Sequence, residues 1–304
     1  MLVVGSVAYD SIKTPFGEIG RALGGSASYF SLAAGYFTQP ALVAVVGEDF
    51  LPQDLAMLKK KNIDLSGLAV MPGKTFAWGG EYGFDMNSRT TLFTELNVFE
   101  NFSPALNGAH KNAEFLFLGN IHPALQIQVL KQVKNPKLVG LDTMNFWIES
   151  AKDELAQAMQ MADVIIINDS EARELTKQHN PLKAARQILN LMQGGEKNLP
   201  ATLVIKRGEY GLLMFQEKKI FHLPGYPLED VADPTGAGDT FAGGFFGYLA
   251  KTKDLSWENL KLACAAGSTL ASFCCEDLGT AKLMNISEAD IDQRIFELKH
   301  LVNF

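Results

Sequence analysis

The chain has 304 residues, 47% of them hydrophobic, and carries a formal net charge of −7. That length is enough for one large α/β domain or two modest ones with a substantial core. The acidic balance argues against nucleic acid as a partner, and the lack of an apolar stretch of membrane-spanning length argues against a membrane.

The amino-terminal run Leu2–Ser6 is apolar and has no basic leader, which predicts a buried strand and not a signal peptide. The three cysteines, Cys264, Cys274 and Cys275, are odd in number and two of them are adjacent, so no disulfide framework is expected. These features predict a reducing, cytoplasmic location.

An acidic residue, Asp10, comes shortly after the first predicted strand. Open α/β sheets bind ligands at the carboxyl ends of their strands, so Asp10 is a candidate for contacting a substrate. The alternative is an aspartate that only stabilises a turn or the start of a helix.

Two adjacent glycines precede the first predicted helix. Gly24 and Gly25 are followed by Ser26, a favoured N-cap residue, and by apolar residues at helical spacing over Ala27–Phe37. This pattern predicts an amphipathic helix that starts at Ser26, and the glycines permit close backbone approach or a hinge there. The next predicted elements are a strand and a helix, Ala41–Val46 and Pro52–Lys61.

The segment Leu68–Phe99 differs from its surroundings, because polar and apolar residues alternate and helical periodicity is lacking. Asp85–Ser88 has the composition of a hairpin turn. We expect a small β-subdomain from roughly residues 10–20 and 68–99, with an edge hairpin of the main sheet as the alternative. Its aromatic residues Trp78 and Tyr82 are candidates for covering a substrate or for packing between two subunits.

From Ala113 onward, strands and helices alternate, and the strands are continuously apolar. This pattern is typical of a parallel sheet covered by helices on both faces. The sequence therefore predicts an α/β fold with a doubly wound, mostly parallel sheet, as a single domain over residues 1–304. The predicted strands are Glu114–Leu118, Leu138–Leu141, Val164–Ile167 and Thr202–Ile205. The predicted helices are Ala124–Val133, Ile148–Met161, Ser170–Lys177, Ala184–Met192 and Trp257–Ser272, and Gly194–Leu199 is the expected exposed loop.

Polar residues follow three successive strands of this predicted sheet. They are Asp142 and Asn145, then Asn168 and Glu171, then Lys206 and Gly208 with Gly211 close behind. Hydrogen-bond acceptors and positively charged side chains at one edge of a parallel sheet predict a ligand site there. Asn168 and Glu171 also fit a capping box at a helix start, and the two roles are compatible.

The stretch Val231–Ala250 carries the strongest chemical signal. Its Gly-rich turn leads into an almost wholly apolar run, which predicts a buried helix whose first N–H groups form an anion site. Asp239 would lie in the first helical turn beside that anion, although like charges repel. Such a carboxylate suits the task of taking a proton from a hydroxyl that attacks a bound phosphate. The alternative is a favourable charge at the start of a purely structural helix.

The residues 233–239, DPTGAGD, resemble the DTxGAGD signature of the ribokinase/phosphofructokinase-B (PfkB) family of carbohydrate kinases, with Pro234 in place of Thr. Asn168 and Glu171 match the NxxE element of that family, and Gly24-Gly25 match its glycine pair. The resemblance spans most of the chain and implies a ribokinase-like fold in which the β-subdomain is a lid. The chain has no GxxxxGK[ST] loop, and no GxGxxG follows the first strand, which disfavours a dehydrogenase.

The resemblance also assigns roles to individual residues. Asp239 is the catalytic base, and the Gly236, Ala237 and Gly238 amides form the anion hole. The implied substrate-binding residues are Asp10, Gly24, Gly25, Ser26 and Asn145. The implied nucleotide-binding residues are Asn168, Lys206, Gly208, Gly211, Thr235, Gly236 and Gly238. For metal ions, Glu171 is implied to hold magnesium through water, Asp142 is a further candidate, and Asp233 matches a position that binds a monovalent cation such as K⁺ in some members.

The implied activity is transfer of the γ-phosphate of ATP, with Mg²⁺, to a hydroxyl of a small sugar, usually a primary alcohol. A nucleoside kinase of the same family is the alternative, because Phe16, Phe30 and the lid aromatics could form a slot for a base. A non-catalytic ligand-binding protein on this fold would be expected to lack Asp239 or the Gly-rich loop. The partners expected are a small-molecule substrate and, through the lid aromatics, a second copy of the chain.

Overall fold

The computed structural model describes residues 1–194 and 199–302, so most of the expected loop Gly194–Leu199 lies outside the described residues. The chain divides into two compact units. The first unit is Met1–Val4 with Ser103–Gly225, and the second is Gly5–Phe102 with Tyr226–Phe304. Each unit is described by itself.

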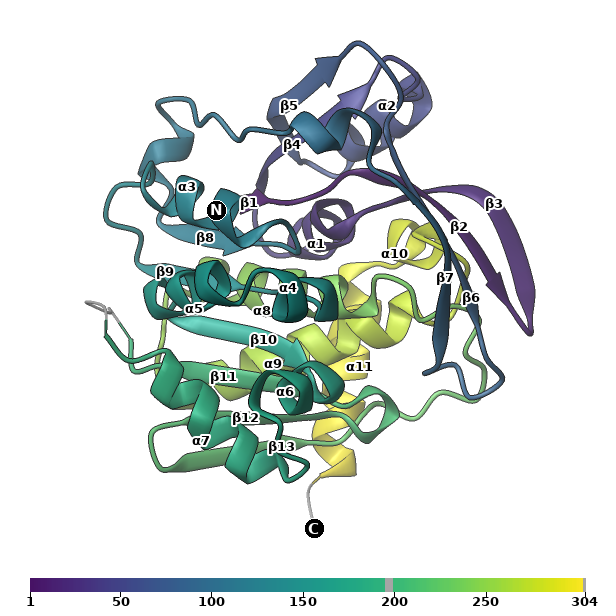
Figure 1. Ribbon diagram of the computed structural model, residues 1–304. Helices are drawn as coiled ribbons and strands as arrows, with labels where there is room; N and C mark the ends of the chain where they lie inside the picture. Colours follow the sequence, from purple (N-terminus) through teal and green to yellow (C-terminus); the bar gives the residue numbers. More distant parts are fainter. Residues whose placement is uncertain (195–198, 303–304) are drawn as a thin grey trace. The chain divides into compact units, whose positions relative to one another are not determined.

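The first unit contains a mostly parallel sheet in the order β13–β12–β11–β10–β9–β8–β1 (Figure 1). Its parallel strands are β1 (Leu2–Val4), β8 (Phe115–Leu118), β9 (Leu138–Leu141), β10 (Val164–Asn168) and β11 (Thr202–Lys206). Their side chains are almost all buried, as continuously apolar strands of a covered sheet require. An antiparallel hairpin, β12 (Leu212–Gln216) and β13 (Lys219–Leu223), which the sequence analysis did not predict, extends one edge.

In the described part of this unit, five helices connect the strands, and α6 packs against β10 and β11 whereas α7 packs against β11. The five helices are α3 (Pro123–Leu130), α4 (Asn145–Ser150), α5 (Lys152–Met161), α6 (Asp169–Thr176) and α7 (Pro181–Leu191). The single helix expected over Ile148–Met161 is broken into α4 and α5, because the backbone at Ala151 (φ −136°, ψ 46°) leaves the helical region. Two short 3₁₀ turns, His110–Asn112 and Gly208–Tyr210, complete the unit.

The second unit contains two sets of strands. β4 (Ala41–Gly47) and β5 (Asp64–Met71) form a parallel pair, whereas the order β3–β2–β6–β7 forms a separate four-stranded sheet, here called the small sheet (Figure 1). The small sheet consists of β3 (Gly17–Gly24), β2 (Ala8–Thr14), β6 (Phe76–Tyr82) and β7 (Arg89–Glu95). The expected turn over Asp85–Ser88 does connect β6 to β7. Residues 68–71, expected within the β-subdomain, instead pair with β4.

Helices of the second unit pack on one another through small residues. α1 (Ser26–Ala34), α8 (Ala237–Thr252) and α9 (Trp257–Cys274) form this core, with Gly243 of α8 close against the Phe30 carbonyl and Gly244 against Gly267. All nine residues of α1 are buried, so the predicted amphipathic character is wrong. The other helical segments of the unit are α2 (Pro52–Lys60), the 3₁₀ turn Asn97–Asn101, α10 (Ala281–Asn285) and α11 (Glu288–Leu301), the last of which was not predicted.

Helices formed by the described part of the chain are all too short or too polar to cross a membrane. The cysteines are free, with Cys264 and Cys274 buried and Cys275 partly buried.

Candidate active site

The Gly-rich turn ends at the amino terminus of α8, in the second unit. Gly236 is the N-cap residue and has a left-handed backbone (φ 75°), and a Cβ atom there would lie 2.4 Å from ring atoms of Tyr29. Glycine is therefore required both by the conformation and by the contact. No side chain caps α8, and Asp239 lies in its first turn. The first N–H groups of a helix lack intrahelical acceptors, so this end is suited to an anion.

One of the three expected anion-hole amides is engaged within the turn itself. The Ala237 N–H donates to the Pro234 carbonyl at 3.2 Å, and the Thr240 N–H donates to the Gly236 carbonyl at 2.8 Å. Gly238 and Asp239 follow Ala237 in α8, and their N–H groups are the next two backbone amides along the helix axis. Gly238 and Asp239 are both partly exposed.

Asp233 stabilises the turn through hydrogen bonds and is fully buried. Its Oδ1 accepts the Thr235 N–H and its Oδ2 accepts the Gly279 N–H, each at 2.8 Å. Burial raises the pKa of this carboxyl, and the N–H donors of Thr235 and Gly279 oppose that rise. Gly279 lies in the segment after α9, and the sequence analysis did not predict its contact with Asp233.

Thr235 connects the turn to two other elements. Its Oγ1 donates to Tyr82 Oη at 3.1 Å, and its carbonyl accepts the Cys274 thiol at 3.4 Å. Thr235 and Tyr82 are both buried. The turn is thus fixed by side chains from β6 and α9 as well as by its own hydrogen bonds.

Asp10 lies on β2 and is only 5% exposed. A Cβ atom on Gly24 would lie 2.0 Å from its Oδ2, so the glycine makes room for the carboxyl. Burial is the main cause that raises the pKa of Asp10 to about 7, and the charges of Asp233 and Asp239 act in the same direction. The Gly25 N–H and the Arg89 guanidinium lower that pKa. Asp10 therefore belongs to the same electrostatic neighbourhood as the start of α8.

Strand register places Asp10 on one face of the small sheet with three further side chains. Asp10 pairs with Trp78 on β6, and Tyr82 of β6 pairs with Arg89 on β7. Residues two or four apart on one strand share a face, so Trp78 and Tyr82 point the same way. The Arg89 guanidinium lies 5.0 Å from the centroid of the Trp78 ring. Arg89 was missed in the sequence analysis, although the predicted turn over Asp85–Ser88 places it opposite Tyr82.

Ser26 does not cap α1 as expected, because the N-cap residue is Gly25. The Ser26 hydroxyl instead accepts the Ser6 N–H at 3.2 Å, and the Ser26 N–H donates to Ser6 Oγ at 3.0 Å. This reciprocal pair holds the start of α1 against the chain that leaves β1.

The first unit brings together the polar residues at the ends of β9, β10 and β11. Asn168 pairs in register with Lys206, and the Lys206 ammonium lies 3.8 Å from Asp142 Oδ2. Burial is the main cause that raises the pKa of Asp142, and Lys206 opposes it. The expectation that these strand ends meet at one edge of the sheet is therefore confirmed.

Asn168 and Glu171 form a complete capping box at the start of α6. The Asn168 Oδ1 accepts the Glu171 N–H at 2.8 Å, and Glu171 Oε2 accepts the Asn168 N–H at 2.7 Å. Glu171 is 7% exposed. The capping role expected for these two residues is therefore present in the structure.

The other predicted residues of the first unit have local partners. The Asn145 amide donates to Glu174, and Gly208 opens a 3₁₀ turn that runs to Tyr210. The Gly211 carbonyl accepts the Arg207 N–H at 2.7 Å, so this glycine closes the loop between β11 and β12. Across the residues described, no three His, Cys, Asp or Glu side chains group closely enough to hold a metal ion directly.

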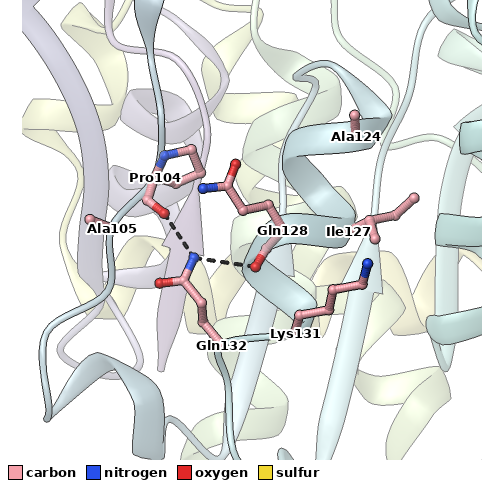
Figure 2. Close-up of a pocket in the computed structure, with 7 residues that line it drawn as sticks. All are labelled: Pro104, Ala105, Ala124, Ile127, Gln128, Lys131 and Gln132. Carbon is pink, nitrogen blue, oxygen red and sulfur yellow. Dashed lines mark hydrogen bonds between the residues drawn. The ribbon is translucent and has the colours of Figure 1, made fainter.

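A pocket of about 440 Å³ in the first unit contains none of the predicted site residues. Figure 2 shows Gln132 on one side of it, with Nε2 donating to the Pro104 carbonyl at 2.9 Å and to the Gln128 carbonyl at 3.2 Å. Lys131 is the charged residue among those that line it. The residues that line this pocket do not resemble the polar residues at the ends of β9, β10 and β11.

Comparison with known proteins places this geometry in context. The family model for the pfkB family of carbohydrate kinases matches residues 3–286. A cytidine kinase from Thermococcus kodakarensis is 27% identical over 262 residues, which cover 84% of this chain and 90% of that protein.

Two solved structures have the same fold. A nucleoside kinase from Burkholderia thailandensis, in complex with inosine, matches with a TM-score of 0.76 and 18% identity over 98% of each chain. A protein from E. coli provisionally named ribokinase II, in complex with ATP and Mg²⁺, matches with a TM-score of 0.77 and 17% identity over 97% of this chain and 98% of that one. The predicted ribokinase-like fold class is confirmed. Because the family model spans nearly the whole chain, this protein belongs to the PfkB family of carbohydrate kinases.

Proposed function

We propose that Asp239 is the base of this kinase and that the start of α8 is its anion hole. In this mechanism Asp239 takes the proton of an acceptor hydroxyl, whose oxygen bonds to the γ-phosphorus of ATP while the bond to the bridging oxygen breaks and ADP leaves. The observation that carries the proposal is the uncapped start of the 16-residue helix α8 with Asp239 in its first turn.

The amides of the anion hole act on the charge that builds up on the transferred group. Because the Ala237 N–H is shared with the Pro234 carbonyl, we assign the larger part to the amides of Gly238 and Asp239. The contacts of Asp233 and Thr235 fix the turn beforehand, so the donors need little reorganisation during the reaction.

In the first unit, Asn168, Lys206, Gly208 and Gly211 are proposed to bind ATP, with Asp142 beside Lys206. Glu171 is proposed to hold a magnesium ion through water, because Mg²⁺ keeps several of its waters and prefers oxygen ligands. Bound with ATP, Mg²⁺ would offset the negative charge of the phosphates. A K⁺ ion at Asp233 stays a prediction. Such an ion would bind a carboxylate whose two oxygens already accept the N–H groups of Thr235 and Gly279.

We propose a nucleoside as the acceptor, with phosphorylation of its primary hydroxyl. Asp10 would accept hydrogen bonds from the ribose hydroxyls, next to Gly24, Gly25 and Ser26. Asn145, which belongs to the first unit, stays a separately predicted substrate-binding residue. The Trp78 ring and the Arg89 guanidinium on the same face of the small sheet suit a planar base that carries hydrogen-bond acceptors. The similarity to a cytidine kinase over 84% of the chain supports this choice.

A small sugar is the second candidate. The fold is shared with the protein provisionally named ribokinase II, and the proposed role of Asp10 requires only a polyol. In either case we propose that the small sheet acts as a lid over the acceptor, and that its exposed apolar residues pair two copies of the chain.

Release of ADP from Mg-ATP across a panel of nucleosides, pentoses and hexoses tests the proposal. We expect acceptor-dependent turnover that is highest with a ribonucleoside such as cytidine and weak with free ribose. Turnover with a hexose or free ribose alone would favour the sugar kinase. No turnover with any acceptor, together with no binding of ATP, would contradict kinase activity.

A further inference from the structure

One hydrogen bond joins the small sheet to the turn that precedes α8. Thr235 Oγ1 donates to Tyr82 Oη at 3.1 Å, with Tyr82 at the last position of β6 and Thr235 next to the N-cap residue Gly236. The two side chains are 8% and 7% exposed. A buried hydroxyl pair costs more to disrupt than an exposed one, because the remaining group is left without a water partner.

The N–H, the carbonyl and the hydroxyl of Thr235 are all hydrogen-bonded, so the position of Thr235 affects that of the adjacent Gly236. The Thr235 N–H is bound by Asp233 and its carbonyl by the Cys274 thiol. Directly after it, Gly236 lies against the Tyr29 ring in a left-handed conformation. A displacement of the Thr235 side chain would therefore move Gly236 and the first amides of α8.

Tyr82 has a second neighbour on the small sheet. Arg89 of β7 lies opposite Tyr82 in the register, and its guanidinium lowers the pKa of the Tyr82 phenol, whereas burial, the larger cause, raises it. The phenol therefore stays protonated at neutral pH, and its oxygen remains available to accept the Thr235 hydrogen. The same strand carries Trp78 of the proposed acceptor face.

We propose that Tyr82 is a positioning residue, which holds the anion-hole turn in its active geometry through Thr235 only while the small sheet is in place. This inference rests on the proposed function of the α8 start as the anion hole. Its consequence is that phosphoryl transfer is coupled to coverage of the acceptor by the small sheet, so that transfer to water stays slow when the sheet moves away.

Hydrogen exchange of the free, full-length protein tests the coupling without any acceptor. We expect amides of residues 233–240 to exchange about five-fold faster in both Tyr82→Phe and Thr235→Val, since each removes one buried hydrogen bond. The double variant should match the single ones, because both remove the same interaction. Thr235→Ser keeps the hydroxyl and should behave like the wild type.

Tyr36→Phe is the matched control, because it also removes a tyrosine hydroxyl that is hydrogen-bonded, here to the Leu283 carbonyl, away from the turn. It should leave exchange of residues 233–240 unchanged. Unchanged exchange in Thr235→Val, or additive effects in the double variant, would overturn the inference.

Kinetics with Mg-ATP and the acceptor found in the panel give the second measurement. In Tyr82→Phe we expect kcat to fall several-fold with KM for ATP unchanged, and the ratio of ATP hydrolysis to acceptor phosphorylation to rise. A lower kcat with an unchanged ratio would contradict the coupling. Failure of the proposed kinase mechanism itself would appear instead as an active Asp239→Asn enzyme.

Discussion

Asp10 shows how burial and function conflict at a single side chain. The carboxyl is almost fully buried next to Gly24, and burial together with the charges of Asp233 and Asp239 raises its pKa to about 7. Its folded pKa exceeds its ordinary value of 3.8, so the folded protein holds a proton that the unfolded chain releases between these two values. Stability contributed by Asp10 is therefore full below about pH 4 and is lost as the pH rises toward 7.

The acceptor KM should depend on this titration. An ionised Asp10 accepts hydrogen bonds from two hydroxyls, whereas the protonated form must donate one, so we expect KM for the acceptor to fall several-fold between pH 6 and 8. In Asp10→Asn this dependence should disappear and KM should be higher throughout. The same variant should gain roughly 1–3 kcal/mol of stability at pH 8 relative to the wild type, measured by urea unfolding. A pH-independent KM in the wild type would contradict the role of Asp10.

The chemistry-bearing residues could be named from the sequence because their local patterns are short and specific. DPTGAGD identifies the uncapped helix start, and Asn168 with Glu171 identifies a helix start that the structure realises as a capping box. Residues whose importance depends on register or on distant segments were missed. Arg89 acts on Asp10 from another strand, and only the register of the predicted hairpin could have indicated it. Tyr29 and Gly279 contact Gly236 and Asp233 from distant segments, and no local pattern marks them.

At the scale of elements, the buried parallel strands were the easiest to predict. Leu138–Leu141 matches the structure to the residue, because a continuously apolar run between turns has few other solutions. The antiparallel strand β13 was missed, since it is mostly exposed. Strand β12 was missed as well, although its sequence, LLMFQ, is an apolar and almost fully buried run. Helix α1 was taken as amphipathic because its apolar spacing is helical, but α8, β3 and β4 pack against it and bury its polar residues too.

The edge strand β7 of the small sheet is exposed and carries apolar side chains. All seven residues of β7 are exposed, Leu92 is 54% exposed, and the exposed rings of Phe16 and Phe84 lie 6.3 Å apart. An exposed edge strand with apolar side chains is a ready site for association. This supports the proposed pairing of two copies through the small sheet.

Sedimentation analysis checks that pairing. We expect the wild type to sediment as a dimer at micromolar concentration and Leu92→Lys to shift toward the monomer. Leu182→Lys, at a 42% exposed position on α7 of the first unit, is the matched control and should leave the dimer intact. A monomeric wild type would contradict the proposal.

At the scale of the whole molecule, the predicted site residues divide between the two units. Asp10, the glycine pair and the α8 start belong to the second unit, whereas Asn168, Glu171 and Lys206 belong to the first. The chain changes from one unit to the other three times, because each unit is assembled from two separate segments of the chain. Composition and periodicity predicted one α/β domain, which stays a prediction. The assembly of each unit from separate segments depends on contacts between residues far apart in the chain, which no local pattern records.

The measurement that tests the central claim most directly compares Asp239→Asn with the wild type in turnover and in ATP binding. The substitution keeps the size and partial exposure of the side chain but removes its ability to take a proton. We predict that kcat falls by about a thousand-fold or more while the Kd for ATP changes less than a few-fold, because the base acts only in the chemical step. An Asp239→Asn enzyme that keeps its kcat within ten-fold of the wild type would contradict the assignment of Asp239 as the base.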